Sequence, residues 1–208
     1  MIRKTDIQRH PERGSSDRLA AYAILDEALL CHVGFDDEGP VVIPMLHARL
    51  GDDLLLHGSP ASRLLRTLSE GAEICVTVTI FDGLVLARSA FNSSANYRSV
   101  VVFGSGHEVT DLSERRTMLD AFTDKLLPGR RPYLRPMTDK EVRATSVVSI
   151  PIEDFSVKTR SGPPSDAASD MSAAVWAGVV PVRLSPLEPQ PDPHTDSDVP
   201  DHVRRMMG

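Results

Sequence analysis

The sequence predicts a mainly β protein in which antiparallel strands close into a barrel flanked by helices. About seven or eight short runs have the composition of strands, and turn residues at hairpin spacing join most of them. A few helical segments stand between these runs, without the strict strand–helix alternation of a parallel sheet. No internal repeat is evident, so a solenoid or propeller is not expected.

The first third of the chain predicts a helix, three strands and a second, short helix. Ser15 or Ser16 can cap the first helix, because a serine hydroxyl accepts a hydrogen bond from a first-turn amide. Segments 36–39 and 51–53 supply turn residues between the strands. The expected elements are a helix over about 15–29, strands over about 30–35, 41–50 and 54–58, and a helix over about 60–69.

The rest of the chain predicts further strands around one longer helix. Residues 81–83 (FDG) predict a hairpin turn, and either Gly104 or Gly106 can mark a bulge or tight bend in a long strand. Pro128 and Gly129 end the longer helix. The expected elements are strands over about 74–80, 84–90 and 98–109, helices over about 114–126 and 138–143, and strands over about 146–152, 155–160 and 176–184.

Composition divides the chain into three parts. Residues 1–14 are a polar lead-in, and residues 15–184 are long enough for one domain with a sizeable core. Residues 185–208 are rich in proline and acidic side chains, which predicts an extended tail draped over a partner subunit.

Charge and residue usage exclude several classes of protein. The net charge of -6 argues against nucleic-acid binding through a basic surface. No apolar run is long enough for a membrane span, and the first residues lack the apolar core of a secretory signal. Cys31 and Cys75 are far apart and sit in apolar runs, so neither a disulfide framework nor a zinc site is expected. A cytoplasmic setting is the expectation that follows.

The segment 57–63 (HGSPASR) has the composition of a phosphate cradle. Gly58 permits close backbone approach, Ser59 and Ser62 offer hydroxyls, and the Arg63 guanidinium matches phosphate oxygens. The alternative is a helix cap with an exposed arginine. His57 belongs to the same cluster, but no second ligand stands at metal-binding spacing, so no metal site is predicted.

A second polar cluster lies at 96–99 (NYRS), where a strand begins. An amide, Arg98 and Ser99 gathered at a strand end favour a site for an anionic, planar ligand; the alternative is a polar surface loop. Lys158 and Arg160 add two cations on one face of a strand, either solvated or facing an anion.

Two apolar segments complete the candidate site. In Val42, Ile43, Pro44 and Met45, the proline lacks a ladder donor, which indicates an edge strand or a bulge whose freed backbone can face a ligand. A tolerated edge proline is the alternative. Trp176 has small neighbours and an indole donor, and is either the wall of a flat ligand or part of the core.

Together these segments resemble the pyridoxamine 5'-phosphate oxidase-like flavoproteins, most closely the flavin-nucleotide-binding or nitroimidazole-resistance-type branch. The resemblance spans about residues 12–184. It rests on 57–63 (HGSPASR), 82–88 (DGLVLAR), 96–104 (NYRSVVVFG), 156–164 (SVKTRSGPP) and 176–181 (WAGVVP) in register.

The resemblance implies a six-stranded antiparallel split β-barrel and a homodimer with two FMN molecules in its interface. The strand over 42–45 would pass the flavin ring with its backbone, and Ser62 and Arg63 would hold the phosphate. Ser99 would come from the other subunit, and Trp176 would lie near the isoalloxazine.

One departure from the family pattern bears on activity. Enzymes that oxidise pyridoxamine phosphate carry an Arg-x-His element shortly after the tryptophan, whereas this chain has 182–185 (VRLS). Vitamin B6 oxidation is therefore not expected, and FMN binding is unaffected. The expected activity is flavin-dependent oxidation or reduction of a small molecule, with no catalytic residue assigned because the flavin carries the chemistry. The alternatives are a non-catalytic flavin carrier or sensor, and a split barrel that holds haem or a deazaflavin.

Overall fold

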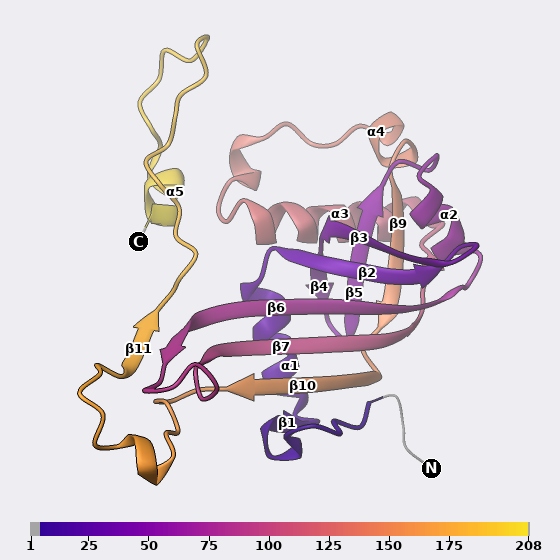
Figure 1. The fold of residues 1–208 in the computed structure, drawn as a ribbon. Coiled ribbons are helices and arrows are strands. Elements are labelled where there is room, and N and C mark those ends of the chain that lie inside the picture. Colours follow the sequence, from indigo (N-terminus) through magenta and orange to yellow (C-terminus); the bar gives the residue numbers. More distant parts are fainter. Residues whose placement is uncertain (1–4, 208) are drawn as a thin grey trace.

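Two antiparallel sheets, whose strands run across one another, form the body of the protein (Figure 1). The computed structural model describes residues 5–207. Residues 1–4 and 208, the outermost parts of the expected lead-in and tail, lie outside the described residues. The body is therefore built on two crossed layers of strands that share a core.

The larger sheet has seven strands and carries the longest hairpin, β6–β7. Long runs of β-branched residues build these two strands, which pair along almost their whole length. In spatial order the strands are β1 (Gly14–Ser15), β10 (Asp154–Arg160), β7 (Ser94–Ser105), β6 (Glu73–Leu86), β2 (Leu30–Asp36) and β3 (Pro40–Leu46), with β11 (Gly178–Pro181) paired to the far end of β6.

The smaller sheet has four strands, in the order β4 (Ala48–Leu50), β5 (Asp53–Gly58), β9 (Ser146–Pro151) and β8 (His107–Glu108). It is buried on both faces. Leu54 and Leu56 of β5 belong to the main core between the sheets, and Leu55 belongs to a second core on the opposite face. Consecutive β5 side chains therefore enter different layers.

Among residues 5–207, α1, α2 and α3 pack on the sheets, α4 packs on α3, and α5 lies in the C-terminal arm (Figure 1). Asp17 caps α1 by accepting from the Leu19 amide, and Asp111 caps α3 in the same way. The helices are α1 (Arg18–Glu27), α2 (Arg63–Ser69), α3 (Leu112–Leu126), α4 (Asp139–Arg143) and α5 (Asp201–Arg204). Within residues 5–207, no helix is both long and apolar enough to cross a membrane.

The chain beyond β11 forms an extended arm that loops away from the sheets (Figure 1). Its end is tied back through α5, where the buried His202 ring stacks on Tyr133 with 4.4 Å between ring centroids. Arg130 Nη1 lies 3.3 Å from His202 Nε2. Residues 182–200 of this arm contain neither helix nor strand, and α5 contacts the segment that follows α3.

The mainly β split-barrel class predicted from sequence is confirmed, although the strand count differs from six. The expected turn at 81–83 is wrong: β6 continues to Leu86 with a register shift between Phe81 and Gly83, and the reversal comes at 87–93. Gly83 allows β11 to approach β6 closely here, because a Cβ at this position would lie only 2.7 Å from the Val180 carbonyl oxygen of β11.

Three other boundaries differ from the predictions. The strand expected over 41–50 breaks at His47 into β3 and β4, and the strand expected over 176–184 is limited to β11. The first helix is capped by Asp17 rather than Ser15 or Ser16. The bend expected at Gly104 or Gly106 is present at Gly106, which lies between the end of β7 and the start of β8. A Cβ at this position would collide with the Val148 side chain.

His47 lies at the corner where the chain passes from the larger sheet to the smaller one, and it is fully buried. Lys125 Nζ of α3 donates to the Leu25 carbonyl at 2.6 Å and lies 3.0 Å from His47 Nε2. Burial lowers the pKa of Lys125 to about 8, and His47 Nε2 also lies 2.9 Å from the Leu25 carbonyl oxygen, so the ammonium, the imidazole and this carbonyl form one polar cluster. This polar junction joins α1, α3 and the strand corner.

We predict that His47 makes folding acid-sensitive. Burial, and then the Lys125 charge, lower its pKa from 6.5 to about 4, so the unfolded chain binds more protons between these values. The stability held above pH 6.5 is lost as the pH falls towards 4, by roughly 3 kcal/mol. Urea unfolding at pH 7 and pH 4.5 should show a smaller loss in His47→Gln than in wild type.

The matched control for this measurement is His107→Gln, because His107 is exposed. That variant should keep the wild-type pH dependence. Equal losses in wild type and His47→Gln would show that the corner histidine does not set the acid sensitivity.

Candidate cofactor site

The larger sheet has one face on the core and one open face, which we call the outer face. Val33, Val76 and Val102 point into the core. Side chains one residue along each strand point the other way, and directly paired residues share a face. The outer face therefore carries Val42, Pro44, Ser99 and Lys158 among the sequence-predicted site residues.

β3 forms the edge of this face. It is the last strand in the sheet order, which confirms the edge position that Pro44 predicts. Val42 is 65% exposed, whereas Ile43 and Met45 pack against the core. The edge thus presents two apolar side chains and a strand backbone without a further strand partner among the described residues.

The predicted phosphate cradle is a tight corner between β5 and α2. Ser59 accepts from the Ala61 amide through its side chain and from the Ser62 amide through its carbonyl. Ser62 is the N-cap residue of α2, yet its hydroxyl makes no capping hydrogen bond. α2 begins at Arg63 rather than near Pro60, so the hydroxyl and the guanidinium stand side by side at the helix start.

Arg63 links this corner to the tip of the β2–β3 hairpin. Its Nε lies 3.0 Å from Asp37 Oδ2, and its side chain is 56% exposed. The ion pair brings the start of β3 close to the start of α2. Two segments that the sequence suggested separately therefore lie together in the fold.

His57 points away from this corner. It follows Leu56 in β5 and faces α3, where its ring meets Phe122 edge-on with centroids 4.2 Å apart. Gly58 faces the other way, because a Cβ there would contact Leu65 of α2. The structure thus separates His57 from Gly58, Ser59, Ser62 and Arg63.

The 96–99 cluster is divided between structural roles and the outer face. Arg98 makes bidentate contacts with Asp82 and with Glu27, and these carboxylates raise its pKa. Asn96 is buried and donates to the Gly162 carbonyl. A ligand contact to Arg98 would have to compete with two ion pairs already present in the protomer.

Ser99 and Lys158 are directly paired across β7 and β10. The Ser99 hydroxyl donates to the Lys158 carbonyl at 3.2 Å, and Lys158 Nζ donates to the Arg9 carbonyl at 2.9 Å. These contacts hold one hydroxyl and one cation next to each other on the outer face.

Trp176 lies just before β11, at the opposite end of β6 from α2 (Figure 1). It is 66% exposed. β6 runs from Glu73 to Leu86, which spans roughly 40 Å at the rise of an extended strand. One protomer therefore does not bring Trp176 to the β3 edge and the α2 corner.

A groove against α3 is the feature that sequence reasoning missed. It has a volume of about 440 Å³ and includes His57. The available signal was an excess of apolar residues at the end of α3, where Leu126 and Leu127 extend the buried side past Phe122. Among the described residues, no cluster of three or more metal-ligating side chains occurs there or elsewhere.

Comparison with known proteins gives a consistent result. The family model described as pyridoxamine 5'-phosphate oxidase matches residues 17–159. The flavocytochrome Anf3 from Azotobacter vinelandii is similar at 40% identity, with a TM-score of 0.90 over 97% of this chain and 95% of that chain. The FAD and heme binding protein from Mycobacterium smegmatis is similar at 39% identity, with a TM-score of 0.90 over 94% and 98%.

A putative 5-nitroimidazole antibiotic resistance protein from Bacteroides thetaiotaomicron is also similar. It shares 25% identity and a TM-score of 0.59 over 70% of this chain and 85% of that chain. A search among curated proteins found no match. The resemblance read from the five sequence segments is confirmed, and the chain belongs to the pyridoxamine 5'-phosphate oxidase family of split barrels.

Proposed function

We propose that this protein binds a flavin between the β3 edge and the α2 corner and acts as a flavin-dependent oxidoreductase on a small molecule. The observation that carries the proposal is the juxtaposition of an unengaged Ser62 hydroxyl and an exposed Arg63 fork with the apolar edge of β3. These residues fit a flavin phosphate on one side and a flat ring on the other.

The residues supply position, charge and shelter. Arg63 would exchange its exposed ion pair with Asp37 for a phosphate, and Ser62 would donate its hydroxyl to the same group. Val42 and Pro44 would cover part of the ring and exclude water from it. A bound flavin supplies hydride or electron transfer, so the protein needs no strong acid–base pair of its own.

FMN is the cofactor expected from the family resemblance, and FAD has the same ring and the same first phosphate. The two relatives that match almost their whole length are named as a flavocytochrome and as an FAD and heme binding protein, and the latter name favours FAD. Released cofactor separated by chromatography distinguishes the two nucleotides.

A homodimer is part of the proposal, because the protomer leaves much of the outer face bare. Trp176 stands roughly 40 Å from the α2 corner along β6, so only Trp176 of the partner subunit would reach the same flavin. Exposed apolar side chains also gather on the outer face, which is typical of an interface. They are Leu30, Val42, Leu46, Phe81, Leu84, Leu86 and Val180.

Haem is a second candidate cofactor alongside the flavin. The names of both near-full-length relatives favour it, one being a flavocytochrome and the other a heme binding protein. The apolar groove beside His57 lies apart from the α2 corner, so the two cofactors would not compete for the same residues.

The proposed activity is tested on the purified, flavin-loaded protein. Reduction of the bound flavin by NAD(P)H, followed by rapid reoxidation with a nitroaromatic acceptor, is the expected result for an oxidoreductase. A reduced flavin that is inert to a panel of acceptors would favour a carrier or sensor. A protein that binds neither FMN nor FAD would contradict the proposed function itself.

We predict that Arg63→Ala weakens flavin affinity by about ten- to a hundredfold, because it removes a charge-assisted phosphate contact. Fluorescence titration of the apoprotein with FMN and FAD measures the change. Arg66→Ala, on the same helix, is the matched control and should bind like wild type. An unaltered affinity in folded Arg63→Ala would remove Arg63 from the site.

We predict that Leu84→Asp dissociates the dimer, because it places a charge among the apolar side chains of the outer face. Sedimentation velocity at micromolar concentration should show a monomer, and flavin affinity should fall with it. Leu19→Asp alters a leucine on α1 that is more exposed than Leu84, and this variant should remain dimeric. Wild-type protein that sediments as a flavin-loaded monomer would refute the shared site.

A further inference from the structure

The segment between β10 and β11, residues 161–177, carries Trp176, and we call it the Trp176 loop. It contains one short 3₁₀ turn, Ala168–Asp170, and neither α-helix nor strand. No residue of this loop is part of either buried core, so apolar packing does not hold it in place. A loop of this length needs polar contacts to keep a single conformation. It lies near the turn at 87–93 that joins β6 to β7 (Figure 1).

A buried ion pair joins the middle of the Trp176 loop to that turn. Asp166 Oδ1 accepts from the Arg88 amide at 2.7 Å, and Asp166 Oδ2 accepts from Arg88 Nη1 at 2.8 Å. The Asp166 side chain is only 2% exposed. Because a buried carboxylate that loses its cation is strongly destabilising, the loop leaves the turn only at a large cost in free energy. The Arg88–Asp166 pair therefore fixes the path of the loop ahead of Trp176.

Contacts at the start of the Trp176 loop act in the same direction. The Asn96 side chain of β7 donates to the Gly162 carbonyl at 3.1 Å. Arg160, the last residue of β10, donates to the Asn96 side-chain oxygen and, at 3.2 Å, to the Pro163 carbonyl. These loop carbonyls thus have donors from the sheet, although they lie outside its ladder. The loop leaves β10 along one path towards Asp166.

The indole of Trp176 lies against the backbone at the start of β11. Gly178 is the first residue of β11 and pairs with Leu86 of β6. A Cβ on Gly178 would lie only 2.8 Å from Cη2 and Cζ2 of the Trp176 ring, so the ring takes the space that a side chain would fill. Trp176 nevertheless remains 66% exposed. The protomer thus holds the indole in one place without covering it.

We propose that Arg88 and Asp166 are positioning residues, whose ion pair holds Trp176 of one protomer in place against the flavin bound by the second copy. This inference rests on the proposed function, in which only Trp176 of the partner subunit would reach the flavin. Neither Arg88 nor Asp166 touches the flavin, and both act through the path of the Trp176 loop. An indole on a loose loop would lose conformational freedom on docking, and a loop that is already ordered avoids this cost.

The inference is tested by the fluorescence of FMN bound to the full-length protein. An indole in van der Waals contact with an isoalloxazine quenches its emission by electron transfer, and this quenching weakens steeply with distance. Because Trp176 is the only tryptophan of the chain, Trp176→Phe supplies the unquenched reference. Wild type should be dim, and Trp176→Phe should be several-fold brighter. Asp166→Ala should be nearly as bright as Trp176→Phe.

The emission is compared on desalted protein at equal FMN content, because free FMN is itself bright. Sedimentation velocity and circular dichroism of Asp166→Ala should match wild type, since the ion pair lies outside both cores. Asp166→Asn keeps the shape of the side chain and weakens the pair by removing its charge. Its emission should lie between those of wild type and Trp176→Phe, and it carries the test if Asp166→Ala does not fold.

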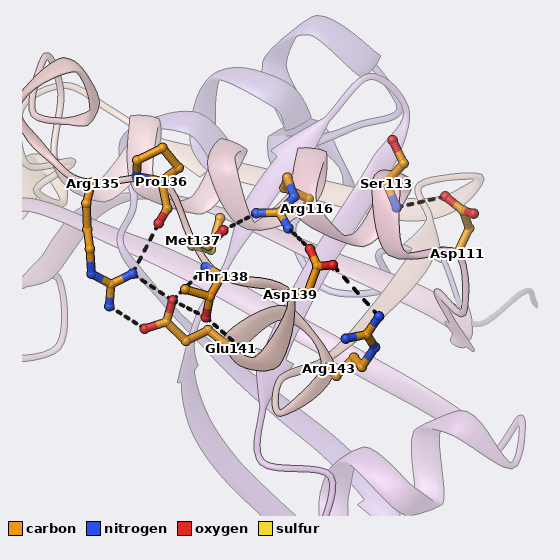
Figure 2. Close-up of polar contacts among 10 residues, drawn as sticks. All are labelled: Asp111, Ser113, Arg116, Arg135, Pro136, Met137, Thr138, Asp139, Glu141 and Arg143. Atoms are coloured by element: carbon orange, nitrogen blue, oxygen red, sulfur yellow. Dashed lines mark hydrogen bonds and ion pairs between the residues drawn. The ribbon is translucent and has the colours of Figure 1, made fainter.

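Two further variants make the result specific. Gly178→Ala leaves the Arg88–Asp166 pair intact but displaces the indole, because the new Cβ would collide with its ring, so the bound FMN should also brighten. Asp139→Ala is the matched control. Figure 2 shows Asp139 between Arg116 and Arg143, with 2.7 Å between Arg116 Nη2 and Asp139 Oδ1. This variant loses an arginine–carboxylate contact of similar length outside the Trp176 loop and should stay as dim as wild type.

The outcomes separate this inference from the proposed function. Folded Asp166→Ala and Asp166→Asn that stay as dim as wild type, beside a bright Trp176→Phe, would overturn the positioning role. Wild-type protein as bright as Trp176→Phe would overturn the contact between Trp176 and the flavin, and with it this inference, while flavin binding would stand. Wild-type protein that binds neither FMN nor FAD would overturn the proposed function and this inference together.

Discussion

Burial of the smaller sheet on both faces is the constraint on which the placement of every candidate site depends. β5 must satisfy two cores at once, with Leu54 and Leu56 on one side and Leu55 on the other. The same alternation continues into His57 and Gly58. It sends the imidazole into the α3 layer and leaves the glycine and the following serines on the α2 side. The end of β5 thereby contributes to the groove against α3 on one side and to the α2 corner on the other.

The elements with strong periodicity were predictable from sequence, and the corners between them were not. β2, β9 and β10 were expected within about a residue, because each is a short run rich in strand-forming residues. The break at His47 was missed, since it depends on Lys125, a residue 78 positions away. The continuation of β6 through Phe81 was missed for a similar reason, because β11 completes its pairing from a distant part of the chain.

For the candidate site, the chemical type of a residue predicted its role better than its closeness in sequence to other polar residues did. Ser62 and Arg63 lie at one corner, as the segment suggested. Arg98 and Ser99 are neighbours in sequence but point to opposite faces, and the fold uses Arg98 to join α1 to the sheet through Glu27. Once a strand is known, the alternation of its side chains between the two faces shows which of two neighbouring residues can reach the site. The α3 groove needed the tertiary structure, because no local pattern unites His57 with a helix about 60 residues later.

β6 is long enough that its two halves differ in burial. Up to about Ile80, β6 lies on the main core, with Val76 and Val78 fully buried. Beyond Phe81, the buried residues are Gly83 and Val85, and the side chains of Leu84 and Leu86 are exposed to water. Local opening is easier where few apolar contacts must be broken. Amide protons should therefore exchange slowly in the first half of β6 and quickly in the second half. When a second copy of the chain covers the β6–β7 hairpin, the slowly exchanging region should extend further towards Leu86.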